Sequence, residues 1–186
     1  MYSTAEFKKG LKIELDSVPY AIVDFQHVKP GKGGAFVRTK LKSLLTGRVL
    51  DQTFRSGEKV KRPDLMEREM QYLYREGDTF CMMDNETYEQ IMLTEDQVGE
   101  ARLYLTENLD VKILFFNQQP VAVELPLFVQ LEVAQTEPGV KGDTAAGGTK
   151  PATLESGVTI QVPLFISEGE RVKVDTRTGT YIERVK

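Results

Sequence analysis

Apolar and polar residues alternate along short segments over most of the chain, and turn-forming residues separate these segments. Alternation with a period of two is typical of β-strands that bury one face. The pattern predicts strands over residues 11–15, 18–25, 35–41, 48–54, 70–75, 79–83, 89–93, 101–105, 111–116, 121–124, 128–133, 159–165, 171–175 and 181–185. Many short strands at a spacing of roughly 8–12 residues predict an all-β protein built from barrels or sandwiches.

Two segments depart from this alternating pattern. Gln97 stands three positions after Thr94, which is the spacing of a capping box at the start of a helix. We therefore predict one short helix near residues 94–100. Residues 139–151 are rich in Gly, Thr and Ala and predict a long flexible loop.

Two positions divide the chain into three parts. Pro63 interrupts the pattern where the charge changes sign, and a segment near Pro126 leads into a new set of strands. We predict three small β-barrel domains, over residues 1–64, 65–126 and 127–186. Each is small for a stable core, so packing between neighbouring domains is expected to contribute.

Charge is unevenly distributed among the three parts. Residues 1–64 hold 13 basic and 7 acidic residues (+6), residues 65–126 hold 4 and 13 (−9), and residues 127–186 hold 7 and 8 (−1). Within residues 27–62 there are ten basic residues and two acidic ones. This imbalance favours a local surface for a polyanion such as RNA, and a solvated basic face without a partner is the alternative. The acidic middle would be repelled by phosphate, so only part of the molecule is expected to contact RNA.

Residues suited to enzyme chemistry are scarce. His27 is the single histidine and Cys81 the single cysteine, so no His-based metal cluster, Cys-x-x-Cys pair or internal disulfide can form. The sequence also lacks the Gly-x-Ser-x-Gly nucleophile motif. We expect no catalytic residues, no metal and no cofactor; a hydrolase is the enzymatic alternative, but its nucleophile–base pair is missing. Cys81 is expected to be buried, and His27 to be a surface or packing residue.

The sequence has no segment typical of membrane insertion or secretion. The longest uncharged apolar-rich run, residues 113–123, is much shorter than the roughly 20 residues that span a bilayer. Residues 1–10 carry charged side chains and no apolar core. We expect a cytoplasmic protein that does not bind membranes.

A glycine-rich loop with a central lysine lies between the strands predicted at 18–25 and 35–41. It consists of Pro30, Gly31, Lys32, Gly33 and Gly34. It is not a phosphate-binding P-loop, because no Ser or Thr follows the lysine and no helix pattern comes next. One interpretation is a plain hairpin turn in which Gly31 supplies the positive φ of a type II turn. The other is a thin cationic finger, because glycines let the backbone approach a partner and lysine carries a modifiable amine on a long stem.

Four basic residues flank this loop and are expected to contact phosphates: Lys29, Arg38, Lys40 and Lys42. A generic protein that binds single-stranded nucleic acid would add exposed aromatic residues as stacking platforms. Here Phe and Tyr lie mostly within alternating strands, as core residues do, and this favours the finger over the stacking protein.

Several segments together resemble one known family. Residues 29–38 read Lys-Pro-Gly-Lys-Gly-Gly-Ala-Phe-Val-Arg, and residues 53–60, 68–74, 83–84 and 87–90 add shorter matches. Residues 150–166 read Lys-Pro-Ala-Thr-Leu-Glu-Ser-Gly-Val-Thr-Ile-Gln-Val-Pro-Leu-Phe-Ile and resemble the family's C-terminal signature, which continues through 169–170, 174–176 and 179–181. Nearly end to end and in the same order, the chain is similar to the elongation factor P family.

The resemblance implies an SH3-like first domain that carries the Lys32 loop, followed by two OB-fold domains, in an elongated arrangement like that of a tRNA. It implies a translation factor that binds both ribosomal subunits through ribosomal RNA, beside the peptidyl-tRNA. Such a factor relieves stalling at consecutive prolines by positioning the CCA end of the tRNA. We expect it to act as a monomer.

The resemblance also assigns roles to single residues. The lysine matching Lys32 is extended by modification in many members, which implies a lysine-modifying enzyme as a further partner. Gly34 stands where glutamine or alanine is common, so the type of modification stays open. Residues matching Gly142, Asp143 and Thr144 are implicated in contacts near the exit-site codon, and those matching Tyr181 and Arg184 in contact with the small subunit.

Overall fold

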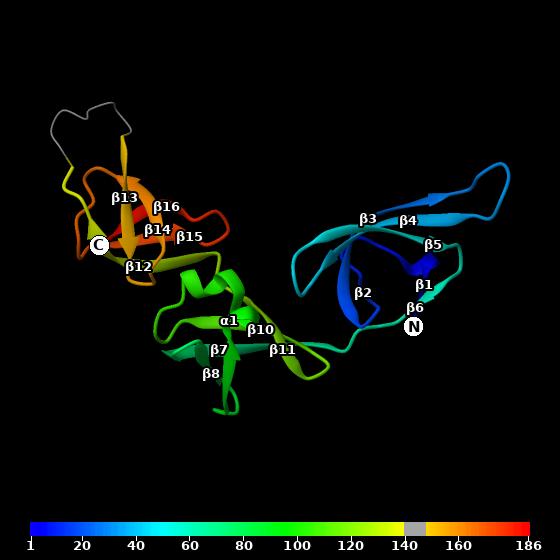
Figure 1. Cartoon of the computed structure of the whole chain (residues 1–186), viewed down its shortest axis with the longest axis horizontal. Coiled ribbons are helices and arrows are strands. Elements are labelled where there is room, and N and C mark those ends of the chain that lie inside the picture. Colours follow the sequence, from blue (N-terminus) through cyan, green and yellow to red (C-terminus); the bar gives the residue numbers. More distant parts are fainter. Residues whose placement is uncertain (140–147) are drawn as a thin grey trace. The chain divides into compact units, whose positions relative to one another are not determined.

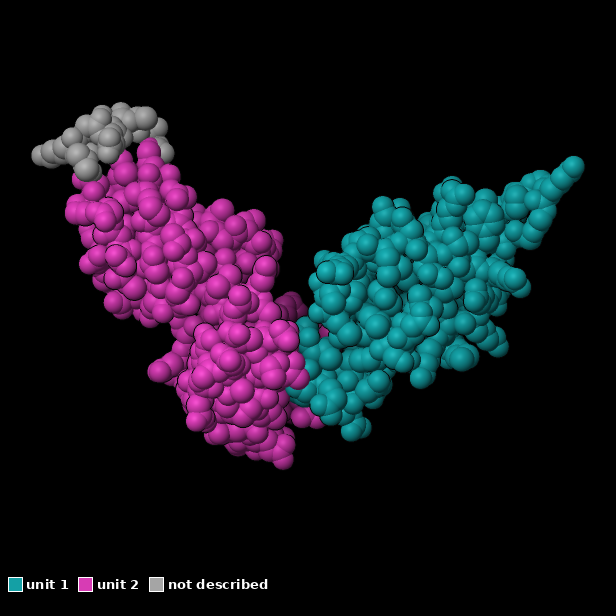
Figure 2. Space-filling view, in the orientation of Figure 1, with its two compact units in different colours: residues 1–66, 115–122 teal, residues 67–114, 123–186 magenta. Residues whose placement is uncertain are grey.

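Short β-strands make up most of the computed structural model, which describes residues 1–139 and 148–186 (Figure 1). The all-β class predicted from the alternating pattern is therefore confirmed. The chain forms two compact units, one of residues 1–66 and 115–122, the other of residues 67–114 and 123–186 (Figure 2). The division into three domains at residues 64 and 126 stays a prediction.

A four-stranded antiparallel sheet with the strand order β2-β3-β4-β5 dominates the first unit. Its strands are β2 (Lys12–Leu15), β3 (Val18–Val28), β4 (Phe36–Ser43) and β5 (Val49–Arg55). Two short strands, β1 (Tyr2–Ser3) and β6 (Lys59–Val60), pair with each other, and the 3₁₀ helix η1 (Thr4–Glu6) follows β1. The Glu14 amide donates a 2.8 Å hydrogen bond to the Lys61 carbonyl, so the chain after β6 returns to the edge of the large sheet.

The core of the first unit lies on one face of this sheet. Every second side chain of β4 is buried, from Val37 to Ser43, and the side chains between them are exposed. The buried core residues are Phe7, Ile13, Ile22, Val37, Leu41, Phe54 and Val60. Because the alternation is strict, burial of this face fixes which side chains of β4 point to solvent.

Two five-stranded sheets contain the remaining strands. The order β11-β10-β7-β8-β9 joins β7 (Leu65–Glu76), β8 (Thr79–Asp84), β9 (Gln90–Thr94), β10 (Asp110–Phe116) and β11 (Gln119–Glu124). The order β14-β13-β12-β15-β16 joins β12 (Phe128–Thr136), β13 (Thr149–Leu154), β14 (Thr159–Pro163), β15 (Arg171–Asp175) and β16 (Thr180–Val185). The core of this last sheet also includes Tyr104, so the segment after β9 contributes to it.

The helical segment after β9 confirms one prediction and corrects another. Thr94 caps α1 (Glu95–Val98), and its side chain and that of Gln97 form the predicted capping box. The strand predicted at residues 101–105 was wrong, because the 3₁₀ helix η2 (Gly99–Leu103) occupies most of this stretch. Val98, Ala101 and Tyr104 are buried at intervals of three, which is the period of a 3₁₀ helix and not that of a strand.

The long loop predicted at residues 139–151 ends earlier than expected, because β13 begins at Thr149. Lys150 is 7% exposed, and its amine donates to the carbonyl of Glu137. A lysine followed by a proline gave no strand signal, since these residues are depleted in strands. Strand pairing with β14, in which Lys150 lies opposite Val162, overrides that local preference.

Candidate functional site

Lys32 lies at the middle of the loop that joins β3 to β4. Val28 and Phe36 form the last pair of the β3–β4 ladder, so residues 29–35 make up the loop. All side chains of residues 29–34 are exposed. The loop projects beyond the sheet of the first unit (Figures 1 and 2). The amine of Lys32 is therefore presented at a hairpin tip, as the finger interpretation predicts.

The glycines of the loop leave its sides open. A Cβ atom added to Gly31, Gly33 or Gly34 would meet no atom within 4 Å, so packing within the protein does not require glycine there. Gly33 alone of the three has a positive φ, at +102°. The prediction that Gly31 supplies the positive φ of a type II turn was wrong, because the left-handed residue follows Lys32 and does not precede it. Glycine at the other two positions keeps the tip narrow.

Arg38, Lys40 and Lys42 lie on one face of the sheet. They alternate with the buried residues of β4 and point away from the core. Lys29 is exposed at the base of the loop. The structure thus brings the four predicted phosphate contacts to a single strand and the loop that precedes it.

The cations along β4 differ in their cross-strand neighbours. Lys40 lies between Asp24 of β3 and Asp51 of β5, and these residues line a hollow of about 390 Å³ on this part of the sheet. The amine of Lys9 lies 3.8 Å from the Asp24 carboxylate. Arg38 lies between the neutral residues Gln26 and Thr53. Lys42, farther from the tip, also lies between neutral residues, Ala21 and Val49. Of the three cations on β4, Lys40 is therefore the one with acidic cross-strand neighbours, which a count of charges along the chain cannot show.

Two residues near the loop received no role in the sequence analysis. Phe36 is half-buried at the start of β4, and the guanidinium carbon of Arg38 lies 5.5 Å from the centre of its ring. Arg55 is exposed and lies directly opposite Phe36 on β5. The sequence signal that could have indicated Phe36 is its position two residues before Arg38 on the same predicted strand. The pairing of Phe36 with Arg55 could not be predicted, because it depends on strand register.

His27 and Cys81 behave as expected. His27 is exposed, and its ring contacts Phe25 edge to face with 5.7 Å between ring centres. Cys81 is buried, and its Sγ lies 3.6 Å from Oε1 of Gln90.

The C-terminal residues predicted to contact the ribosome lie on β16 but have different surroundings. Tyr181 is half-buried and packs against the core of the last sheet. Arg184 is exposed, its guanidinium carbon lies 5.5 Å from the ring centre of Phe165, and its Nη1 lies 3.4 Å from Oε1 of Glu170. Gly142, Asp143 and Thr144 lie outside the described residues.

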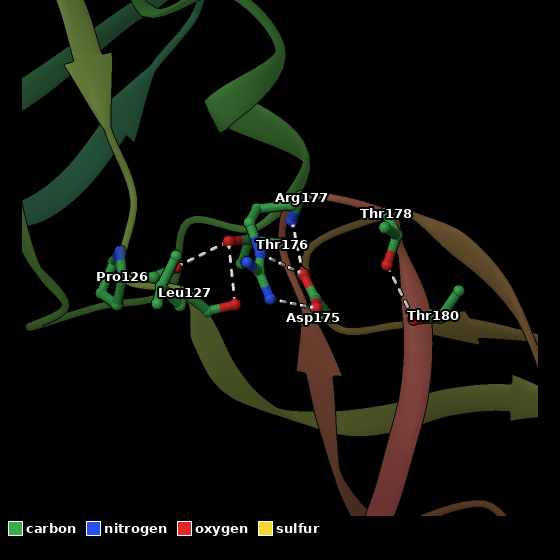
Figure 3. A network of polar contacts seen from close by, with 7 residues as sticks. All are labelled: Pro126, Leu127, Asp175, Thr176, Arg177, Thr178 and Thr180. Carbon is green, nitrogen blue, oxygen red and sulfur yellow. Dashed lines mark hydrogen bonds and ion pairs between the residues drawn. The ribbon is translucent and has the colours of Figure 1, made fainter.

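The turn from β15 to β16 is held by a polar network (Figure 3). Both carboxylate oxygens of Asp175 accept hydrogen bonds from the Arg177 guanidinium, at 3.2 and 2.9 Å, and these bonds lower the pKa of Asp175. The Thr176 hydroxyl donates to the carbonyls of Pro126 and Leu127, at 2.6 and 3.2 Å. The network therefore ties the turn to the connection between β11 and β12.

Within residues 1–139 and 148–186, no group of three or more His, Cys, Asp or Glu side chains is placed to hold a metal ion. In the same part of the chain, no helix is long and apolar enough to cross a membrane.

Family models match the chain in three successive segments. The elongation factor P KOW-like domain matches residues 3–60, the elongation factor P OB domain residues 65–123, and the elongation factor P C-terminal domain residues 129–184. A protein named elongation factor P from Desulfitobacterium hafniense (strain DSM 10664 / DCB-2) is 59% identical over 184 residues, which is 99% of this chain and 100% of the relative. The protein of that name from Natranaerobius thermophilus is 57% identical over 100% of this chain and 99% of its own length.

Solved structures are similar as well. Eukaryotic translation initiation factor 5A from Methanococcus jannaschii aligns with a TM-score of 0.54 at 28% identity, over 64% of this chain and 88% of its own. The likeness extends to both sequence and fold.

Proposed function

The chain belongs to the elongation factor P family, whose members are translation factors and not enzymes, and on this premise we propose that it binds the ribosome beside the peptidyl-tRNA. There it stimulates peptide-bond formation and relieves stalling at consecutive prolines. The observation that carries this proposal is the exposed amine of Lys32 at the tip of a narrow hairpin loop.

The proposed mechanism is positional. Proline reacts slowly in part because its ring restricts the geometry of attack. A factor that holds the CCA end of the peptidyl-tRNA in a reactive geometry removes an orientational and entropic penalty without supplying an acid, a base or a nucleophile. Lys32 fits this role because its compact charge sits on a long, flexible stem that can reach into a crowded RNA cavity.

The cations behind the tip would set the register of the factor on RNA. Lys29, Arg38, Lys40 and Lys42 share one strand and its loop, so they can contact neighbouring phosphates while Lys32 reaches the tRNA end. Because Lys40 lies between two aspartates, we expect Lys29, Arg38 and Lys42 to contribute more than Lys40.

Further parts of the proposal follow the family. The C-terminal residues Tyr181 and Arg184 would face the small subunit, and Gly142, Asp143 and Thr144 would lie near the exit-site codon. Three domains, over residues 1–64, 65–126 and 127–186, would span the two subunits. A lysine-modifying enzyme would extend Lys32, and the factor would act as a monomer in the cytoplasm.

The test is replacement of Lys32 by alanine. Lys32→Ala is expected to abolish stimulation of a Pro-Pro-Pro reporter in a purified translation system and to leave the fold intact, because the side chain is exposed. Lys112→Ala, which removes an exposed lysine from β10, is the matched control and is expected to retain stimulation. Normal reporter synthesis with Lys32→Ala would refute the proposal.

A further inference from the structure

A mixed aromatic and cationic surface lies directly behind the tip of the loop. Phe36 is the first residue of β4, and the guanidinium carbon of Arg38 lies 5.5 Å from the centre of its ring. Val28 on β3 and Arg55 on β5 lie directly opposite Phe36 on its two sides. Directly paired residues of antiparallel strands share a face, and so do residues two apart on one strand, so these four side chains point to the same side of the sheet.

Backbone hydrogen bonds hold Arg55 opposite Phe36. Its amide donates a 2.9 Å hydrogen bond to Oε2 of Glu58, and its carbonyl accepts a 2.9 Å hydrogen bond from the Glu58 amide. The next amide, of Ser56, donates to the carbonyl of Ala35 at 3.0 Å, which joins the end of β5 to the base of the loop. Arg55 is therefore fixed at the level of Phe36 by bonds that do not involve its guanidinium group.

Charge indicates which partner this surface fits. Ten of the residues between 27 and 62 are basic and two are acidic. Of the two acids, Glu58 uses a carboxylate oxygen to accept from the Arg55 amide, and Asp51 lies farther along the sheet, opposite Lys40. An apolar ring with one guanidinium group over it, that of Arg38, and a second arginine on the neighbouring strand suits an unpaired nucleobase, which can stack on these planar groups while its phosphates contact the cations.

We propose that Phe36, Arg38 and Arg55 form a stacking platform for an unpaired nucleotide at the end of an RNA. This inference rests on the proposed function, since it takes a single-stranded RNA end as the partner of the loop. It adds a positioning role for the side chains of Phe36 and Arg55. These two side chains would contact the base, whereas Lys32 supplies only charge.

Two RNA probes test the platform without a ribosome. One is an RNA hairpin with four unpaired nucleotides at its 3′ end, and the other is the same hairpin with a blunt end. Binding of each to the full chain is measured by fluorescence anisotropy at low ionic strength. The full chain is expected to prefer the overhang probe by on the order of tenfold, the effect of stacking one base.

Substitutions separate stacking from charge and from folding. Phe36→Leu keeps an apolar side chain but no aromatic face, and is expected to remove the preference while leaving affinity for the blunt probe unchanged. Phe36→Tyr is expected to keep the preference, which shows that the position tolerates change. Arg55→Gln is expected to weaken binding of both probes and to reduce the slope of log affinity against log salt by about one.

Two results would overturn the platform: an equal affinity of the full chain for the two probes, or a Phe36→Leu variant that keeps the full preference with an unchanged circular dichroism spectrum. Either result can occur while Lys32 still drives the Pro-Pro-Pro reporter. Failure of the platform is therefore distinguishable from failure of the proposed function.

Discussion

Replacement of Gly179 by alanine is expected to destabilise the last sheet through a single contact. Gly179 lies in the turn from β15 to β16 with a φ of +70°, and a Cβ atom there would lie 2.9 Å from the hydroxyl of Tyr104. Tyr104 is 9% exposed and belongs to the core of this sheet, so its rigid ring cannot swing away freely. Gly169 provides a matched control, because its φ is +85° and an added Cβ atom would meet nothing within 4 Å.

The two substitutions share one cost and differ in another. The left-handed conformation destabilises a residue with a Cβ atom by about 1–2 kcal/mol. Alanine also lowers the conformational entropy of the unfolded chain, which offsets about 0.4–1 kcal/mol of this. Gly169→Ala should therefore lower the free energy of unfolding by about 1 kcal/mol. Overpacking adds about 1–3 kcal/mol, so Gly179→Ala should lower it by about 2–4 kcal/mol.

Urea unfolding followed by circular dichroism measures these differences, and the chain has no tryptophan to serve as a fluorescent signal instead. Tyr104→Phe removes the oxygen that the new Cβ atom would meet. In the double variant with Gly179→Ala, the overpacking cost should largely disappear, which gives a favourable coupling energy of about 1 kcal/mol or more. An equal loss of stability for the two glycine variants, together with additive effects in the double variant, would refute this reasoning.

Three further predictions concern charge and hydrogen bonding. The Arg177 guanidinium lowers the pKa of Asp175, and the amides of Glu86 and Thr87 lower that of Asp84. Each carboxylate should therefore contribute to folding stability above the ordinary carboxyl pKa of 3.8, and this contribution should decline as pH falls below that value. If the free energy of unfolding of Asp175→Asn falls at acidic pH as steeply as that of the unchanged chain, Asp175 does not make this contribution. Thr176→Val removes the donor to the carbonyls of Pro126 and Leu127 and should cost about 1–2 kcal/mol in urea unfolding, whereas Thr178→Val, which removes an exposed hydroxyl that pairs with that of Thr180, should cost less. Arg38→Gln should weaken ribosome binding more than Lys40→Gln, and Asp51→Asn should strengthen it, as measured by sedimentation with ribosomes at two salt concentrations; equal effects of the two cation variants would contradict the neutralisation of Lys40.

Local patterns anticipated much of the fold. The alternation of β4, the capping box at Thr94 and the exposed hairpin tip at Lys32 each depend on residues close together in the chain. Periodicity and turn chemistry act within such short segments, so the sequence is sufficient to predict them. The same reasoning failed for residues 101–105, because a short apolar run is compatible with both a strand and a helix.

Neighbours across strands could not be predicted in this way. Asp24 and Asp51 beside Lys40, and Arg55 beside Phe36, follow from the register of three strands. A shift of one residue in either ladder would have placed other side chains there. The sequence showed a surplus of positive charge, and the register decided where that charge is compensated and where it is not.

By itself, then, the sequence determined the strand-rich class, the exposed lysine between glycines and the family to which the chain belongs. Tertiary structure alone decided that Tyr104 approaches Gly179, that β13 contains a buried lysine, and that an arginine of β5 lies opposite Phe36. The physical reason is the range of the interactions. Alternation and turn formation are properties of consecutive residues, whereas packing and charge compensation depend on which distant segments the buried faces bring together.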